Sequence, residues 1–305
     1  MVSIVIPSRV DQYLQQTVDD LLAKAGGEVE VIVVLDGYWP SPILKNDPRV
    51  IIVHQGELHN NLGMRKAIDA GMALARGAYV MKCDEHTMWD KGYDLKLIAD
   101  CQDDWCVIPR RKRLDADKWE VIEDGRPDVD YMYVEYPYLK PFDRTQGLHG
   151  ELWKKTNDLE IDDTPTMQGS CYFMKKSYWD KLFPNGMDEE NYGKFTQEAQ
   201  EISMTVWLSG GEVKVNKKTW YAHAHKGKSG KGYGFTTEQY RKHEAEKEKG
   251  RLYCIEHWLA HPKFKWFINE KFPNMPNWEG WESRITKDAE HDWSKDPSKQ
   301  PSEWL

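Results

Sequence analysis

The sequence predicts an α/β fold in which a mostly parallel central sheet is flanked by helices. Short apolar runs rich in β-branched residues recur along the first third of the chain. Segments with apolar residues at helical spacing separate several of these runs, and polar residues follow them. Strands that alternate with helices favour a parallel sheet, because the intervening helix carries the chain back to the same edge.

The predicted strands of this region are Ser3–Ile6, Val29–Leu35, Val50–Val53, Tyr79–Met81 and Trp105–Ile108. The second of these is almost wholly apolar, which is typical of a central strand covered on both faces. Two helices are expected, over Asp11–Ala25 and Asn61–Gly77. In each, apolar residues recur every three or four positions and glycine stands at the end.

The segment Arg110–Pro165 reads as a long, polar, aromatic-rich insertion without clear periodicity. Insertions of this kind often shape a substrate pocket, although a solvated loop region is an equal alternative. Beyond it, a helix is expected over Glu198–Leu208, ended by Gly210 and Gly211, and a short strand over Glu212–Val215.

The chain is expected to divide into a main domain of residues 1–235 and a C-terminal part of residues 236–305. The C-terminal part contains a charged helix over Glu238–Lys249 and then a tail rich in Trp and Pro. We expect this tail to pack back on the main domain as irregular structure.

Composition limits the functional classes. The 305 residues are 40% hydrophobic and 30% charged, as in soluble globular proteins, and no apolar run has the length of a membrane span. The N-terminus enters a strand pattern at once, so no secretory signal is expected. The five cysteines form no CxxC pair, which favours reduced thiols and a cytoplasmic location. A net charge of −8 argues against a broadly basic nucleic-acid surface, although the run Arg110–Arg113 leaves a local patch open.

Polar residues follow three of the predicted strands: Pro7-Ser8-Arg9, Asp36 and Asp84–His86. Ligands of open parallel sheets bind beyond the carboxyl ends of the strands. Asp84 and His86 lie two positions apart on an extended segment, so their side chains point the same way. A carboxylate and an imidazole suit a divalent ion such as Mn²⁺. The alternative is a polar strand end that caps the next turn.

The order of these motifs resembles a known family. The first strand ends in Pro and the second in Asp-Gly. A helix with the pattern Asn-x-Gly-x-x-x-Ala-x-x-x-Gly comes next, formed by Asn61, Gly63, Ala67 and Gly71. A strand that ends in Asp-x-His follows this helix. This order is similar to nucleotide-sugar glycosyltransferases of the GT-A fold, broadly family 2.

The downstream half resembles the polypeptide N-acetylgalactosaminyltransferases. Thr164–Gly169 is similar to their Pro-Thr-Met-Ala-Gly segment, and Glu198–Glu201, followed by Trp207 and Gly210-Gly211, to their Glu-Asn-x-Glu helix. The resemblance covers about residues 1–235. Where that family has Trp-Gly-Gly before the glutamate, this chain has Phe195-Thr196-Gln197, so N-acetylgalactosamine is not carried over as the donor sugar.

The resemblance implies three metal ligands, Asp84, His86 and His223, holding Mn²⁺ or Mg²⁺. His223 lies twelve residues beyond Gly211, where the family has its third ligand. His225 is a rival for this role, and a surface histidine is the alternative for either one.

The resemblance also implies contacts to the donor. Lys226 falls where the family uses an Arg on the diphosphate, and Lys66 matches a basic position, whereas Arg65 could equally be a solvated helix charge. Asp36 would accept from the base, which is uracil if the donor is UDP-linked; the alternative is a turn-forming Asp-Gly pair. The full expected set of donor-binding residues is Pro7, Arg9, Asp36, Arg65, Lys66, Asp84, Gly169 and Lys226.

Glu198 and Glu201 are the catalytic candidates. An acidic residue at this point is a general base in inverting family 2 enzymes and a sugar or acceptor contact in the retaining N-acetylgalactosaminyltransferases. The alternative is an acidic first turn favoured by the helix dipole. Glu85, between the two metal candidates, should point to the opposite face and is assigned no ligation.

The function implied is a metal-dependent transfer of a sugar from a nucleoside diphosphate, UDP above all, to an acceptor hydroxyl. A glycan or lipid-linked intermediate is the expected acceptor, and hydroxymethylated bases of viral DNA are an alternative. A polypeptide acceptor is disfavoured, because neither a secretory signal nor a lectin-like repeat is found. A sugar-phosphate nucleotidyltransferase is a second alternative, but the segment after the first strand, residues 7–11, lacks the glycine-rich loop of that class. A non-catalytic binding module would not need all three metal candidates.

Overall fold

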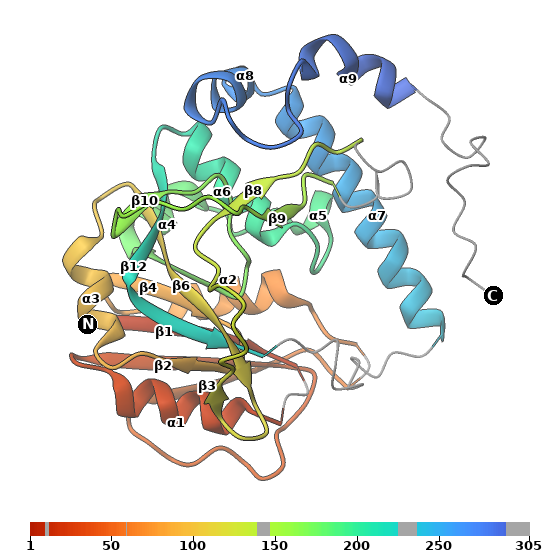
Figure 1. The fold of residues 1–305 in the computed structure, drawn as a ribbon. Coiled ribbons are helices and arrows are strands. Elements are labelled where there is room, and N and C mark those ends of the chain that lie inside the picture. Colours follow the sequence, from red (N-terminus) through yellow and green to blue (C-terminus); the bar gives the residue numbers. More distant parts are fainter. Residues whose placement is uncertain (10–11, 59, 139–146, 225–236, 291–305) are drawn as a thin grey trace.

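The computed structural model describes residues 1–9, 12–58, 60–138, 147–224 and 237–290 (Figure 1). The strands are β1 (Val2–Ser8), β2 (Val29–Asp36), β3 (Val50–Gln55), β4 (Tyr79–Cys83), β5 (Thr87–Trp89), β6 (Trp105–Asp115), β7 (Glu120–Val121), β8 (Met132–Val134), β9 (Gly150–Leu152), β10 (Ile161–Asp163), β11 (Cys171–Lys175) and β12 (Glu212–His223). The helices are α1 (Leu14–Lys24), α2 (Met64–Leu74), α3 (Tyr93–Asp100), α4 (Lys176–Leu182), α5 (Glu189–Tyr192), α6 (Glu198–Leu208), α7 (Thr237–Leu259), α8 (Phe264–Trp266) and α9 (Trp281–Glu290), with a π-helical turn at Phe267–Lys271.

One mixed sheet organises the chain, with the strand order β10-β12-β6-β11-β4-β1-β2-β3. The strands β3, β2, β1 and β4 are mutually parallel, as predicted. β11 runs antiparallel to both β4 and β6, while β12 pairs parallel with β6. The α/β fold with helices on both faces is confirmed, and its antiparallel strands, β11 and β10 among them, make the sheet mixed.

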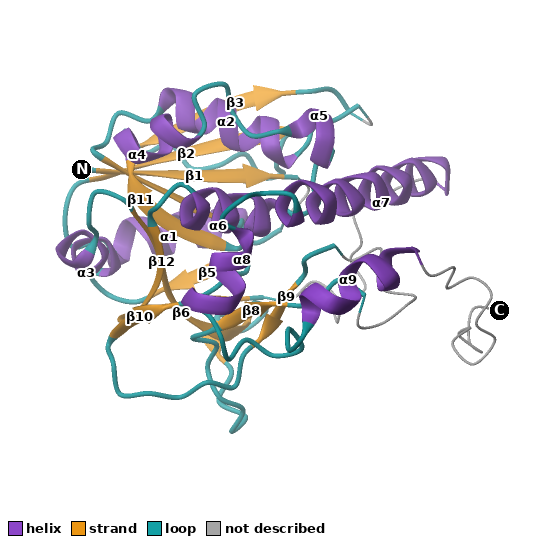
Figure 2. Cartoon of the chain, turned by 90° about the horizontal axis from the view of Figure 1, so that it is seen from above, coloured by secondary structure: helices purple, strands orange, loops and turns teal. Residues whose placement is uncertain are grey.

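Two helical layers enclose this sheet (Figure 2). On one face, Leu14, Val18 and Leu21 of α1 share an apolar core with Ile4 and Ile6 of β1, and α3 joins the same core. The helices α2, α4 and α6 cover the other face. The strand β2 is buried along its whole length, as its apolar sequence predicted.

The region expected to be a long insertion is more ordered than its polarity suggested. The strand β6 continues through Arg110–Arg113 to Asp115, and these residues pair with the second half of β12. Farther along, β8 pairs with β9, and β10 extends the main sheet at its edge. Because β12 offers this long partner, the polar run is held as a strand although it lacks an apolar pattern.

The described C-terminal residues, 237–290, pack on the α6 side of the sheet (Figure 1). Cys254, Ile255 and Trp258 of α7 lie in the same core as Trp207 of α6. The tail contains α8, the π-helical turn and α9, so it is more helical than the irregular structure expected. Even α7, with 23 residues the longest described helix, is too polar to cross a bilayer, and the other described helices are too short or too polar as well.

Candidate active site

A cavity of about 780 Å³ opens beyond the carboxyl ends of β1, β2 and β4. Pro7, Arg9 and Asp36 line it from the ends of β1 and β2, and Asp84 and His86 from the end of β4. Gly169, Glu198 and His223 also face it. The predicted strand-end residues therefore share one cavity.

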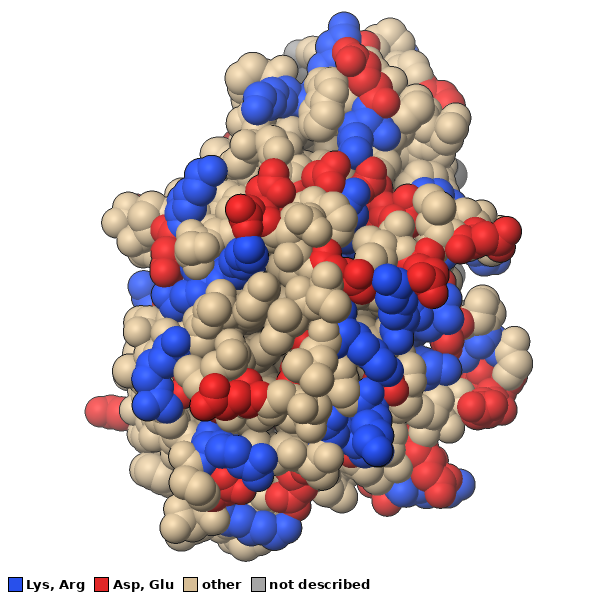
Figure 3. All heavy atoms as spheres, turned by 90° about the vertical axis from the view of Figure 1, so that its left-hand side faces the viewer, with Lys and Arg blue, Asp and Glu red and all other residues tan. Residues whose placement is uncertain are grey.

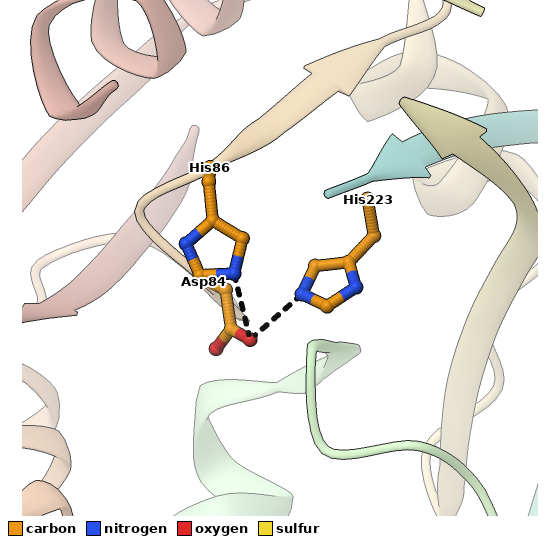
Figure 4. Close-up of side chains that lie close together, drawn as sticks. All are labelled: Asp84, His86 and His223. Atoms are coloured by element: carbon orange, nitrogen blue, oxygen red, sulfur yellow. Dashed lines mark hydrogen bonds and ion pairs between the residues drawn. The ribbon is translucent and has the colours of Figure 1, made fainter. Parts of the chain in front are cut away.

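Asp84, His86 and His223 converge at the floor of this cavity (Figure 4). The Oδ2 atom of Asp84 lies 3.1 Å from Nε2 of His223 and 3.9 Å from Nε2 of His86. One ligand atom from each residue lies within 4.8 Å of the others. The pairing of β5 with β12 explains the convergence, because it sets His223 directly opposite Thr87, the residue after His86.

This cluster fits a divalent cation. One carboxylate oxygen and two imidazole nitrogens are a donor set that Mn²⁺ accepts. Both histidines are buried, whereas the Asp84 side chain is a quarter exposed and faces the cavity. Burial alone would raise the pKa of Asp84, but Lys82 and the two histidines hold that pKa well below its usual value. The carboxylate is therefore ionised and available to a cation.

Lys82, which the sequence analysis missed, links the Asp84 carboxylate to Glu198 of α6. Its Nζ lies 2.8 Å from Oδ1 of Asp84, 2.5 Å from the carbonyl oxygen of Gly169 and 3.4 Å from Oε1 of Glu198. The side chain is only 1% exposed. A lysine inside an otherwise apolar strand, two positions before Asp84, was the available signal, since alternation sets both on one face.

Glu198 stands in the first turn of α6 and is 5% exposed. Gln197, with a left-handed φ of 58°, turns the chain into this helix. Burial raises the pKa of Glu198, while Lys82 opposes that rise. A side chain on Gly169 would approach the Glu198 carboxylate to 2.7 Å, so glycine permits this close contact.

Arg65 and Glu201 do not line the cavity. The guanidinium of Arg65 is 0% exposed; Nε and Nη2 donate to Oε2 of Glu201 at 3.0 and 2.8 Å, and the remaining bonds go to the carbonyls of Gly193 and Thr196. These two residues form a buried ion pair between α2 and α6. The polar atoms of Arg65 and Glu201 bind each other and the backbone, and their expected contacts to the donor or the acceptor stay predictions.

Lys66 is also outside the cavity lining. Its side chain is 53% exposed and lies 3.6 Å from Glu189, which is the geometry of a surface ion pair. Lys226 and its neighbour His225 lie outside the described residues.

The strand-end residues Asp36 and Glu85 also hold backbone in position. Asp36 accepts from the N–H groups of Leu62 and Gly63 at 2.8 and 2.7 Å, and so fixes the loop before α2. Glu85 accepts from the Ser8 hydroxyl and from the Arg9 N–H, and so fixes the end of β1. Glu85 is not part of the cluster formed by Asp84, His86 and His223.

Nearby carboxylates form ion pairs with the basic run at Arg110–Arg113. Arg110 lies 2.6 Å from Asp130, Lys112 lies 3.3 Å from Asp128, and Arg113 lies 2.8 Å from Asp124. On the face shown in Figure 3, basic and acidic side chains are interspersed. A run that is paired in this way has less charge to offer to nucleic-acid phosphates.

The fold and the cavity define an α/β transferase of the GT-A type. Residues 3–183 match the model of glycosyl transferase family 2. The chain belongs to this family.

Two known proteins extend the comparison. Mouse polypeptide N-acetylgalactosaminyltransferase 5 is 25% identical over 205 residues, which are 61% of this chain but only 20% of that protein. The crystal structure of GalNAc-T7 with UDP, GalNAc and Mn²⁺ superposes with a TM-score of 0.59 at 14% identity. That match covers 86% of this chain and 58% of GalNAc-T7, and it supports the GT-A fold.

Proposed function

We propose that this protein is a metal-dependent glycosyltransferase that moves a sugar from a UDP-linked donor to an acceptor hydroxyl. The convergence of Asp84 and His86 with His223, across 139 positions of sequence, carries the proposal. Family membership supports the reaction class, and the UDP and Mn²⁺ bound by the structurally similar GalNAc-T7 support the choice of donor and metal.

In this proposal the donor lies along the strand ends. The base occupies the end of the cavity at Pro7 and Asp36, and the diphosphate extends past Arg9 toward the three-residue cluster. A divalent ion there would supply positive charge to the leaving diphosphate. Asp84 holds one ligand oxygen toward that ion, and Lys82 keeps the carboxylate oriented through its other oxygen.

Glu198 is the proposed catalytic residue. Its carboxylate faces the cavity beside Gly169, so it is suited to accept a hydrogen bond from the acceptor hydroxyl and to take its proton. Burial raises the pKa of Glu198, which makes the carboxylate a stronger base. Lys82 keeps enough positive charge nearby for the carboxylate to ionise.

The metal role is tested by calorimetric titration of UDP with and without Mn²⁺. We expect UDP to bind much more tightly with Mn²⁺, and Asp84→Ala to reduce that affinity about tenfold or more, because the ion loses its carboxylate ligand. Asp19→Ala, which removes a half-exposed carboxylate paired with Lys45, is the matched control. The proposal would be overturned if UDP bound equally well without Mn²⁺ and if Asp84→Ala left that binding unchanged.

The transferase role is tested by incubating the protein with a panel of UDP-sugars and Mn²⁺. Enzymes of this class hydrolyse their donor slowly when no acceptor is present, so we expect release of UDP from one member of the panel. If the wild type releases UDP and the Glu198→Gln variant releases it at the same rate, Glu198 is not the catalytic residue.

A further inference from the structure

Gln200 is a buried amide at the cavity to which the proposed reaction gives no role. It lies in the first turn of α6, two positions beyond Glu198, and it lines the cavity although the residue is only 5% exposed. A buried amide atom without a hydrogen-bond partner is unfavourable, so such groups are nearly always paired in a folded protein. The hydrogen bonds of Gln200 therefore show what the site still lacks.

A chain of hydrogen bonds fixes which atom of this amide is free. The Ser203 hydroxyl donates to the carbonyl oxygen of Ala199 at 2.7 Å, so it can only accept from the Thr166 hydroxyl, at 3.2 Å. The Thr166 hydroxyl thereby uses its one proton, and it accepts from Nε2 of Gln200 at 3.5 Å. Oε1 of Gln200 has no hydrogen-bond partner among the described residues, and it is not one of the buried atoms sealed from solvent. A molecule in the cavity can therefore reach it.

The segment that leads into β11 shows on which side of Glu198 this amide lies. The carbonyl oxygen of Ser170 accepts from the N–H of Asp84 at 3.0 Å, next to the three-residue cluster. One residue back, a side chain on Gly169 would meet Oε2 of Glu198 at 2.7 Å. Three residues farther back is the hydroxyl that Gln200 binds. Gln200 therefore lies beyond Glu198 as seen from the cluster, which is the side expected for the acceptor.

A second amide lies in the same segment, one residue before Gly169. Gln168 lines the cavity, and its Oε1 accepts from the Ser170 hydroxyl at 3.2 Å. Its Nε2 has no hydrogen-bond partner among the residues that the structure describes, so it can donate. Glu198 apart, the described parts of α6, β8, β9 and this segment present no ionised side chain to the cavity. The site thus offers one neutral acceptor atom and one neutral donor beside the proposed catalytic residue.

A hydroxyl group both donates and accepts, and a sugar carries several hydroxyls on one rigid ring. We propose that Gln200 and Gln168 bind an uncharged sugar that serves as the acceptor, through hydroxyls close to the one that reacts at Glu198. Gln200 is then a specificity residue, because a sugar without the matching hydroxyl leaves Oε1 unpaired. This inference rests on the proposed function, because it names the acceptor class of the same site.

The test uses the full chain saturated with UDP and Mn²⁺, so that the donor part of the cavity is filled. The probes are the methyl glycosides of glucose, galactose and N-acetylglucosamine, with methyl glucuronide as a charged counterpart, and the dissociation constant follows from the rise in melting temperature with probe concentration. We expect saturable binding of at least one neutral glycoside. Gln200→Met, which keeps the length of the side chain but not the amide, should weaken that glycoside about tenfold or more. Binding of none of the neutral glycosides, or tighter binding of the glucuronide than of all of them, would overturn the inference.

Monodeoxy forms of the bound glycoside separate recognition from a structural role. The form that lacks the hydroxyl bound by Gln200 should bind wild type and Gln200→Met alike, since that contact is already absent. If the variant weakens every deoxy form by the same factor, the amide is structural and the inference is overturned. Gln102→Met makes the same change at an exposed position outside the cavity lining, and it should bind the glycoside as wild type does. Equal weakening by this control would also overturn the inference.

Two further outcomes are read from separate titrations. If Gln200→Met weakens a UDP-sugar, with no acceptor present, as strongly as it weakens the glycoside, the amide binds the donor sugar and the inference is overturned. Absence of Mn²⁺-dependent UDP binding in wild type would refute the proposed function itself. Because the glycosides are compared only in protein that has bound UDP, a failure of the inference is distinguished from a failure of the proposed function.

Discussion

Two clusters of cation and carboxylate share the first turn of α6, one through Glu201 and the other through Glu198. In one, Arg65 binds Glu201 and two backbone carbonyls, and stacks over Tyr192 at 5.0 Å. In the other, Lys82 lies between Asp84 and Glu198, and Asp84 remains a quarter exposed to the cavity. The planar guanidinium satisfies a fixed set of acceptors, whereas the ammonium is a point charge that leaves carboxylate oxygens available. The comparison teaches that the buried cation of the first cluster is used up by partners within the fold, whereas the cation of the second cluster holds two carboxylates at the lining of the cavity.

The largest effect is expected at Arg65. Arg65→Met would leave the Glu201 carboxylate buried without its cation, so the free energy of unfolding should fall by about 3–5 kcal/mol. Urea denaturation measures this loss. Arg49→Gln, at an ion pair that is about half exposed, should cost less than about 1 kcal/mol. A small loss for Arg65→Met would show that the first cluster is not structural.

The next effect concerns Glu198. Glu198→Gln keeps the shape of the side chain but removes the proton acceptor, so turnover should fall about 10²-fold or more. Affinity for UDP with Mn²⁺ should change little, which calorimetry checks. If Glu198→Gln keeps its turnover but lowers the free energy of unfolding, the second cluster would be structural, as the first is.

Lys82 should show a mixed effect of intermediate size. Lys82→Met leaves the buried Glu198 carboxylate and the partly exposed Asp84 carboxylate without the cation between them, so we expect a loss of about 1–3 kcal/mol in the free energy of unfolding. Mn²⁺ should restore part of this stability, because it supplies positive charge beside Asp84. Melting temperatures with and without Mn²⁺ measure the rescue, which Arg65→Met should not show beyond the wild-type response.

The smallest effect is expected at Lys66. Lys66→Gln removes an exposed charge that is already paired with Glu189, so UDP affinity should change less than about twofold. Calorimetry under the conditions used for Asp84→Ala provides the measurement. A clear loss of affinity for UDP would support the contact between Lys66 and the donor that the family resemblance implied.

Much of the fold was predictable because its signals are local. The apolar run of β2 and the helical spacing of α2 lie in continuous sequence, and the predicted bounds of α6 agree with the structure. β11 was missed because Cys171–Lys175 is short and directly precedes a helix. The extension of β6 was missed because its pairing with β12, and not its own pattern, holds it in the sheet.

The candidate site was predictable where its residues follow strands, as Asp84 and His86 do. The bond between Arg65 and Glu201 could not be predicted, because a lone arginine on a helix carries no signal of a carboxylate 136 positions away. The cavity face of α7 was missed for a related reason. Its charged sequence is typical of a solvated helix, and only its packing on α5 and α6 turns basic side chains toward the cavity.

The pairing of β5 with β12 has a consequence for how the protein matures. His223 lies at the end of β12, the last of the described strands along the chain, and the pairing with β5 sets it opposite Thr87. A nascent chain that ends before β12 would contain Asp84 and His86 but lack His223, and it would bind a cation weakly. If the proposed ion binds to this cluster, its tight retention would report that β12 has joined the sheet.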